Sequence, residues 1–175
     1  VEPLRIQSPI SVRDPRQGRS LAVFPSETFG VSCVIDYPGT WIGTQAFFTE
    51  RLDTAAFLGE IAEARTFCLE SELEALRVAG LGKGGSFQNT LVVGKEGPLN
   101  PEALSFPDGC VRHKVLDLIG DLALLGRPIV GHVVAFRSGH GIHLSLVSRL
   151  RCLVQNLKRE KNAKEDPACS IFTKS

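Results

Sequence analysis

The chain of 175 residues contains no methionine, not even at position 1, where a translation product normally begins. Two interpretations of this absence stay open. Either the N-terminus has been processed or trimmed, or the chain is a piece of a longer protein whose N-terminal part is missing.

Long apolar runs and an excess of one charge are also lacking. No apolar segment reaches the roughly 18 residues that a membrane span requires. The formal net charge is +1 and no basic run is interleaved with aromatic residues, so the sequence offers no argument for nucleic-acid binding. The five cysteines are an odd number without paired short spacing. They favour reduced, mostly buried thiols in a cytoplasmic setting over a disulfide framework or a cysteine-type zinc site.

The patterns that are present predict both strands and helices. Alternating segments predict an antiparallel meander of strands near the N-terminus, over residues 4–12, 20–24, 30–36 and 41–52. Helical periodicity then predicts helices over residues 55–64, 69–79, 108–125 and 144–157. Two further strands are expected over residues 90–93 and 129–137. The order predicts an α+β fold, a two-layer sandwich in which a mostly antiparallel sheet packs against helices.

The domain boundary follows from the same patterns. We expect one α+β domain over residues 1–157, because the chain is long enough to bury a core without crosslinks. Residues 158–175 are charged and lack periodicity, so we expect a disordered tail there.

The helix expected over residues 108–125 carries a polar stripe beside its apolar face. His113, Asp117 and Asp121 follow one another at intervals of four residues, so they share one side of the helix. A histidine and a carboxylate one turn apart can hold one metal ion together, because a turn rises only about 5.4 Å. The alternative is a simple hydrogen bond on a solvated helix face. Two protein ligands are also too few for catalytic zinc, which normally has three and a water.

His140 is a second candidate for chemistry. It lies between two glycines after an expected strand, and a tight turn with little crowding suits a group that approaches a substrate. The alternative is a loop histidine without a function. His132, inside the expected strand, and His143, at the start of the last helix, are further possibilities.

A series of short motifs runs along the chain in a fixed order. They are Ala64-Arg65-Thr66-Phe67, Gly84-Gly85-Ser86 with Asn89, Leu99-Asn100, Phe106-Pro107, Val111-Arg112-His113-Lys114 with Asp117, Gly120-Asp121-Leu122 and Ser138-Gly139-His140-Gly141. On these motifs the chain resembles the bacterial UDP-3-O-acyl-N-acetylglucosamine deacetylases of lipid A biosynthesis, over residues 8–153. In that family two similar α+β domains pack face to face around a zinc site. The resemblance covers the second domain only, because the first domain's zinc-binding histidine and glutamate base have no counterpart here.

The resemblance implies a metal pair and a proton donor. His113 and Asp117 look like two of the three zinc ligands. His140 would stabilise the developing charge and protonate the leaving amine. Asp121 would hydrogen-bond His140 and keep it oriented and protonated.

The resemblance also implies how the substrate is held. Thr66 would donate to the oxyanion on the acetyl carbon. Lys114 would face the negatively charged nucleotide end, and Phe67 would pack against the sugar or the acyl chain. The chain departs from the family at Cys68-Leu69, where Gly-Phe is usual, and at Ile142-His143, where asparagines are usual.

Two functions are therefore expected from the sequence. The first is zinc-dependent removal of the N-acetyl group from UDP-3-O-acyl-N-acetylglucosamine, in the cytoplasm or at the inner face of the membrane. The missing first domain, on the same or a separate polypeptide, would be the partner. The second is a catalytically incomplete module of the same fold that binds the lipid or the nucleotide sugar, or has a regulatory role.

Overall fold

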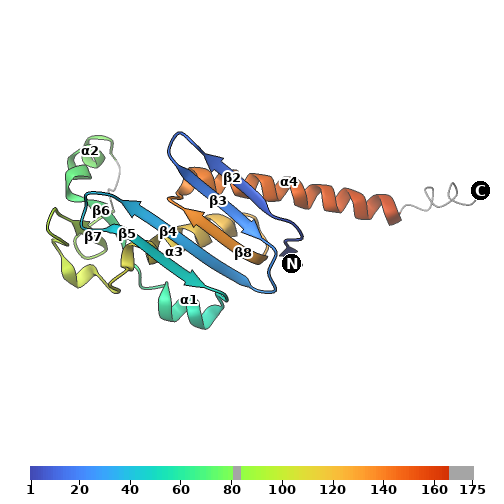
Figure 1. The fold of residues 1–175 in the computed structure, drawn as a ribbon, viewed down its shortest axis with the longest axis horizontal. Coiled ribbons are helices and arrows are strands. Elements are labelled where there is room, and N and C mark those ends of the chain that lie inside the picture. The colour runs from blue at the N-terminus through green and yellow to red at the C-terminus, as the bar shows by residue number, and fades with distance from the viewer. Residues whose placement is uncertain (81–83, 166–175) are drawn as a thin grey trace, which may run out of the picture.

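The computed structural model of the chain describes residues 1–80 and 84–165. Its larger sheet is built from strands β1 (Leu4–Arg5), β2 (Ile10–Asp14), β3 (Arg19–Phe24), β4 (Phe29–Tyr37), β5 (Gly43–Thr49) and β8 (Ile129–Phe136). The strand order is β2-β3-β8-β4-β5 (Figure 1). The short β1 pairs with the beginning of β8. The sheet is mixed, because β8 is parallel to β1 and β4 and antiparallel to β3.

Helices cover one face of this sheet. The two helices on this face are α3 (Gly109–Ala123) and α4 (His140–Glu165). The shorter helices α1 (Thr54–Glu60) and α2 (Leu73–Val78) and the 3-10 turns η1 (Glu70–Glu72) and η2 (Pro101–Ala103) lie in the connections between β5 and α3. Helix α3 packs on β4 and β5, and α4 packs on β2 and β3 (Figure 1). Fully buried apolar side chains fill the space between the layers, among them Leu21, Val31, Val115, Leu118, Val133 and Leu146. The expected α+β fold, with a sheet packed against helices, is confirmed.

A second, two-stranded sheet lies at one end of the domain. Strands β6 (Thr66–Leu69) and β7 (Thr90–Val93) are parallel, and α2 lies in the connection between them. The buried side chain of Asn100 holds this region together. It accepts a hydrogen bond from the Val92 amide at 2.8 Å and donates to the carbonyls of Phe87 and Thr90 at 2.7 Å each.

Several boundaries differ from the sequence-based expectations. The antiparallel meander is wrong, because β8 lies between β3 and β4 and pairs with both. The strand expected over residues 4–12 is two strands, since Pro9, between them, has no amide proton to donate to a ladder. The break expected at residues 65–67 contains the start of β6. The helix expected over residues 69–79 is a 3-10 turn followed by the shorter α2, and the strand expected over residues 41–52 is limited to β5.

The last helix is longer at both ends than expected. It begins at His140 instead of residue 144 and continues to Glu165. The tail expected from residue 158 is thus helical as far as Glu165, and residues 166–175 lie outside the described residues. Within residues 1–80 and 84–165, no helix combines the length and the apolar character needed to cross a membrane.

The described cysteines are unpaired thiols, as expected. Cys33 and Cys110 are buried, Cys68 is half-buried and Cys152 is exposed. Burial raises the pKa of Cys33 to about 12 and that of Cys110 to about 11, so neither is a thiolate at neutral pH. Cys169 lies outside the described residues.

Candidate functional site

The polar stripe of α3 brings His113 and Asp117 together. Nε2 of His113 is 3.4 Å from Oδ1 of Asp117, and the two side chains are 15% and 17% exposed. Nδ1 of His113 lies 3.1 Å from the carbonyl oxygen of Ala64. Because a carbonyl only accepts, Nδ1 carries a proton, and Nε2 is the ring nitrogen that faces the carboxylate of Asp117.

The geometry of this pair fits a shared metal ion. Two ligands of a tetrahedral zinc ion with bonds of about 2.0–2.1 Å are about 3.3–3.4 Å apart. The 3.4 Å between His113 Nε2 and Asp117 Oδ1 matches that separation. The other oxygen of Asp117, Oδ2, accepts from Nζ of Lys114 at 2.9 Å. The Ala64 and Lys114 contacts thus orient the imidazole and a carboxylate oxygen side by side.

Strand β6 places Phe67 against this pair. The rings of Phe67 and His113 meet edge to face with centroids 6.5 Å apart, and Nζ of Lys114 lies 5.6 Å from the Phe67 centroid. Tyr37, at the end of β4, packs edge-on against Phe67 at 5.6 Å. Tyr37 was not singled out from the sequence, since its contact depends on β4 and β6 meeting. Thr66 is exposed at the start of β6, and no contact tests its expected role.

A cavity of about 820 Å³ adjoins the same strands. Its lining includes Thr66, Phe67, Leu73, Arg77, Phe87 and Val92. The wall combines apolar side chains with polar ones that include Glu74 and Asn89, and the two residues expected to contact the substrate from β6 lie in it.

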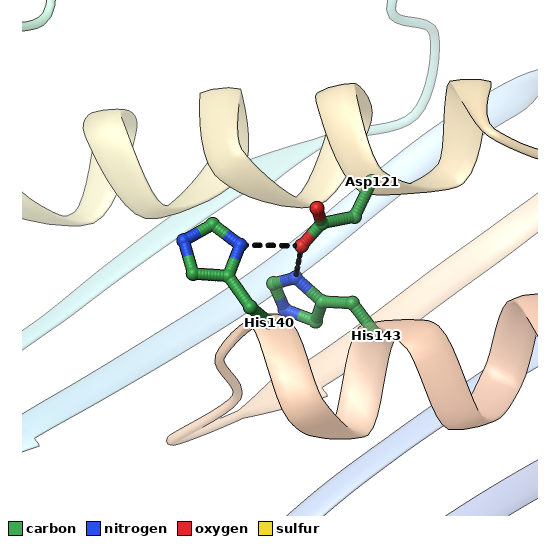
Figure 2. Close-up of side chains that lie close together, drawn as sticks. All are labelled: Asp121, His140 and His143. Atoms are coloured by element: carbon green, nitrogen blue, oxygen red, sulfur yellow. Dashed lines mark hydrogen bonds and ion pairs between the residues drawn. The ribbon is translucent and has the colours of Figure 1, made fainter.

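A second group forms where α3 faces the first turn of α4 (Figure 2). Oδ2 of Asp121 lies 2.7 Å from Nδ1 of His140 and 2.7 Å from Nδ1 of His143. His140 is 65% exposed, Asp121 is 16% exposed, and His143 is fully buried. The contact between Asp121 and His140 is the one that the resemblance implied. Their chemical roles stay a prediction.

His140 does not lie on the tight turn that the flanking glycines suggested. It is the first residue of α4, directly after Gly139. A side chain added at Gly139 or Gly141 would meet nothing within 4 Å. The surroundings of His140 are therefore uncrowded, as expected, although the helix and not the turn fixes its position.

In the part of the chain that the structure describes, Asp121, His140 and His143 form a group that could hold a metal ion, with ligand atoms within 4.8 Å of one another. Their separations match hydrogen bonds better. Two nitrogens at 2.7 Å from the same oxygen are closer than the roughly 3.3 Å between ligands of one zinc ion. Nε2 of His143 also has a partner already, the hydroxyl of Ser138 at 2.8 Å.

His143 is the functional candidate to which the sequence assigned no role. It follows His140 by three residues and lies in phase with the buried Leu146 and Leu150, a spacing that was available as a signal. Burial lowers the pKa of His143, against the opposing effect of its hydrogen bond to Asp121. His132 lies elsewhere, on β8, where its Nε2 is 2.7 Å from the hydroxyl of Ser32.

Comparisons with known proteins agree with this arrangement of motifs. The chain is 47% identical over 148 residues to a UDP-3-O-acyl-N-acetylglucosamine deacetylase of Solibacter usitatus (strain Ellin6076), covering 84% of this chain and 48% of that protein. It is 44% identical over 146 residues to the deacetylase of the same name from Aquifex aeolicus (strain VF5), covering 83% of this chain and 49% of that protein. The chain spans about half the length of the curated relatives it matches. The family model for the UDP-3-O-acyl N-acetylglycosamine deacetylases (LpxC) matches residues 1–151, and the chain belongs to this family.

Proposed function

We propose that this chain is one half of a zinc-dependent amidase that removes the N-acetyl group from UDP-3-O-acyl-N-acetylglucosamine in lipid A biosynthesis. One observation carries the proposal. A pair with metal-ligand spacing, His113 and Asp117, lies one helical turn from a carboxylate that is hydrogen-bonded to the exposed His140. An amidase needs these two functions close together, one to activate the amide and one to protonate the departing amine.

His113 and Asp117 would hold the zinc ion, through Nε2 and Oδ1 respectively. The third ligand and the general base would come from the first domain of the family, on the same or a separate polypeptide, and that domain is the expected partner. When bound, zinc supplies Lewis-acid activation of the acetamide and of water. Ala64 and Lys114 would keep the two ligands oriented through the hydrogen bonds described above.

His140 would act as the acid. Its Nδ1–H would donate to the Asp121 carboxylate at 2.7 Å, which orients the ring and leaves Nε2 as the nitrogen that faces a substrate. Because the side chain is 65% exposed, a proton on Nε2 can reach a substrate. Transfer from Nε2 to the nitrogen of the breaking amide would release the free amine. The hydroxyl of Thr66 would donate to the oxygen that becomes negative on the acetyl carbon.

The substrate's apolar and charged ends would meet different, neighbouring side chains of this centre, since Nζ of Lys114 lies 5.6 Å from the Phe67 centroid. The cavity beside β6 and β7, with Phe67, Leu73 and Phe87 in its wall, suits an acyl chain. Lys114 would face the nucleotide diphosphate. Unpaired thiols and the resemblance support a reaction in the cytoplasm or at the inner face of the membrane, where a substrate with one apolar and one charged end would be met.

Complementation tests the proposal directly. The chain is purified alone and again with the N-terminal half of the Solibacter relative, and zinc content and acetate release are measured in both states. We expect stoichiometric zinc and deacetylation in the mixture. His140→Ala should lower turnover by about two or more orders of magnitude with zinc retained.

A matched control is His132→Ala, which removes a histidine from the sheet and should leave turnover within about threefold. Neither zinc nor activity in any mixture would reject the amidase and leave a binding module of the same fold. Full turnover by His140→Ala would instead reject the acid assignment alone.

A further inference from the structure

One turn of α4 after the exposed His140 lies a second histidine, His143, which is buried. His143 is fully buried, and both of its ring nitrogens have partners in the structure: Asp121 Oδ2 at 2.7 Å from Nδ1, and Ser138 Oγ at 2.8 Å from Nε2. Ser138 is itself only 9% exposed. A buried titratable side chain with this degree of satisfaction is held in one orientation.

The direction of each hydrogen bond follows from the chemistry of the partners. An ionised carboxylate only accepts, so Nδ1 of His143 carries a proton and donates it to Asp121. The titratable groups that face His143 are Asp121 and Asp117 from α3 and His140 from its own helix. Since burial favours the neutral ring, Nε2 has no proton and the Ser138 hydroxyl donates to it. The hydrogen bonds therefore all donate in one direction, from Ser138 to His143 and from His143 to Asp121.

The last hydrogen bond of this series is accepted by the same Asp121 oxygen that contacts His140. Oδ2 of Asp121 therefore accepts two hydrogen bonds, one from an exposed ring and one from a fully buried ring. The buried donor fixes the carboxylate against rotation and takes up part of its negative charge. The orientation and the remaining charge of this oxygen are what the His140 ring meets at its Nδ1.

We infer that His143, supported by Ser138, is a positioning residue that fixes the carboxylate of Asp121 toward His140 and moderates the charge His140 meets. It touches no substrate in this arrangement and acts through Asp121 alone. The inference rests on the proposed function, because the placement of His140 matters only if His140 transfers a proton.

Two substitutions of similar polarity test the two ring nitrogens of His143 one at a time. In His143→Asn the amide nitrogen takes the place of Nδ1 and can still donate to Asp121. In His143→Gln the amide reaches the place of Nε2 and Ser138, and the donor to Asp121 is lost. If His143 had only a structural role, both variants would lose stability and the pKa of His140 would be the same in both.

The readout is the pKa of His140, measured by ring-nitrogen NMR titration of the full chain and its variants. We expect His143→Gln to raise this pKa by about half a unit or more, because Asp121 then keeps a single donor. His143→Asn should stay within about 0.2 unit of the parent. Equal values in all three proteins, a lower pKa in the Gln variant, or an equal rise in both variants would overturn the inference.

Two further measurements cover the remaining outcomes. If His143 variants do not fold, Ser138→Ala removes only the distal link, and a small rise of the His140 pKa is expected because an imidazole without a donor at Nε2 is a weaker donor at Nδ1. No rise there overturns the inference. In the reconstituted enzyme, His143→Gln should lower kcat about tenfold or more at unchanged KM, and His143→Asn less than about threefold. The NMR difference without any deacetylase activity would refute the proposed function and still support the placement of His140 by His143.

Discussion

Removing the carboxylate of Asp121 should destabilise the chain mainly because the buried His143 loses its acceptor, and little because the exposed His140 does. In Asp121→Ala, Nδ1–H of the fully buried His143 loses its acceptor, and an unsatisfied buried donor costs about 1–3 kcal/mol. The bond to His140 adds about 0–1 kcal/mol, because that side chain is 65% exposed and water replaces the partner. We therefore expect the free energy of unfolding to fall by about 1–4 kcal/mol, most of it from the buried His143.

Urea unfolding followed by circular dichroism at pH 7.5 measures this difference, with the slope against urea as a check that the unfolded state is unchanged. His140→Ala is the matched control, since it removes the other end of the exposed bond only, and it should cost less than about 1 kcal/mol. Equal losses in the two variants would refute the division of the cluster into one buried and one exposed hydrogen bond. A loss below about 0.5 kcal/mol for Asp121→Ala would show that the carboxylate is not needed to satisfy His143.

Three further measurements address acid stability, the second sheet and the metal. Because burial lowers the pKa of His143 in the folded chain, the unfolded chain binds the extra proton below about pH 6.5, so stability should fall there by up to about 1.4 kcal/mol per pH unit. In His143→Asn the free energy of unfolding should fall less between pH 7.5 and pH 5.0 than in the parent chain. An equal fall in the two proteins would contradict this prediction. Asn100→Leu should cost about 3 kcal/mol or more in calorimetry, because three hydrogen bonds to the backbone are lost, whereas the exposed Asn89→Ala should cost less than about 1. His113→Gln should weaken zinc binding at least about tenfold in a chelator competition, and a similar loss in His132→Gln would argue against the assigned ligand.

The helical stripe was predictable from the sequence because its determinants are local. The apolar positions of α3, Val111, Val115 and Leu118, fix which side of the helix meets the sheet. Once that face is set, residues four apart must share the neighbouring side, and His113 and Asp117 converge for that reason. The partner of Asp121 is on another helix, and its identity came from the resemblance, not from the periodicity.

The pairing of strands that are far apart in the sequence could not be predicted from local residue patterns. Strand β8 has an alternating sequence that predicts a strand, but nothing in it specifies a place between β3 and β4. Strand β6 is only four residues long and pairs with β7 across an intervening helix, so residues 65–67 looked like a break. Tyr37 was missed for the same reason, since its contact with Phe67 exists only after these strands have been placed.

The two functional pairs depend on the fold in different ways. His113 and Asp117 are on one helix, so α3 brings their side chains together, and contacts with Ala64 and Lys114 orient them. Asp121 and His140 are on different helices, so their 2.7 Å hydrogen bond requires α3 and α4 to dock in one register. His143 makes the second bond between the same two helices, one turn further along α4 and fully buried. In the proposed function His140 must be exposed to reach its substrate, so burial cannot hold it in place. By our inference the neighbouring buried imidazole of His143 meets that need by fixing the carboxylate that both rings share.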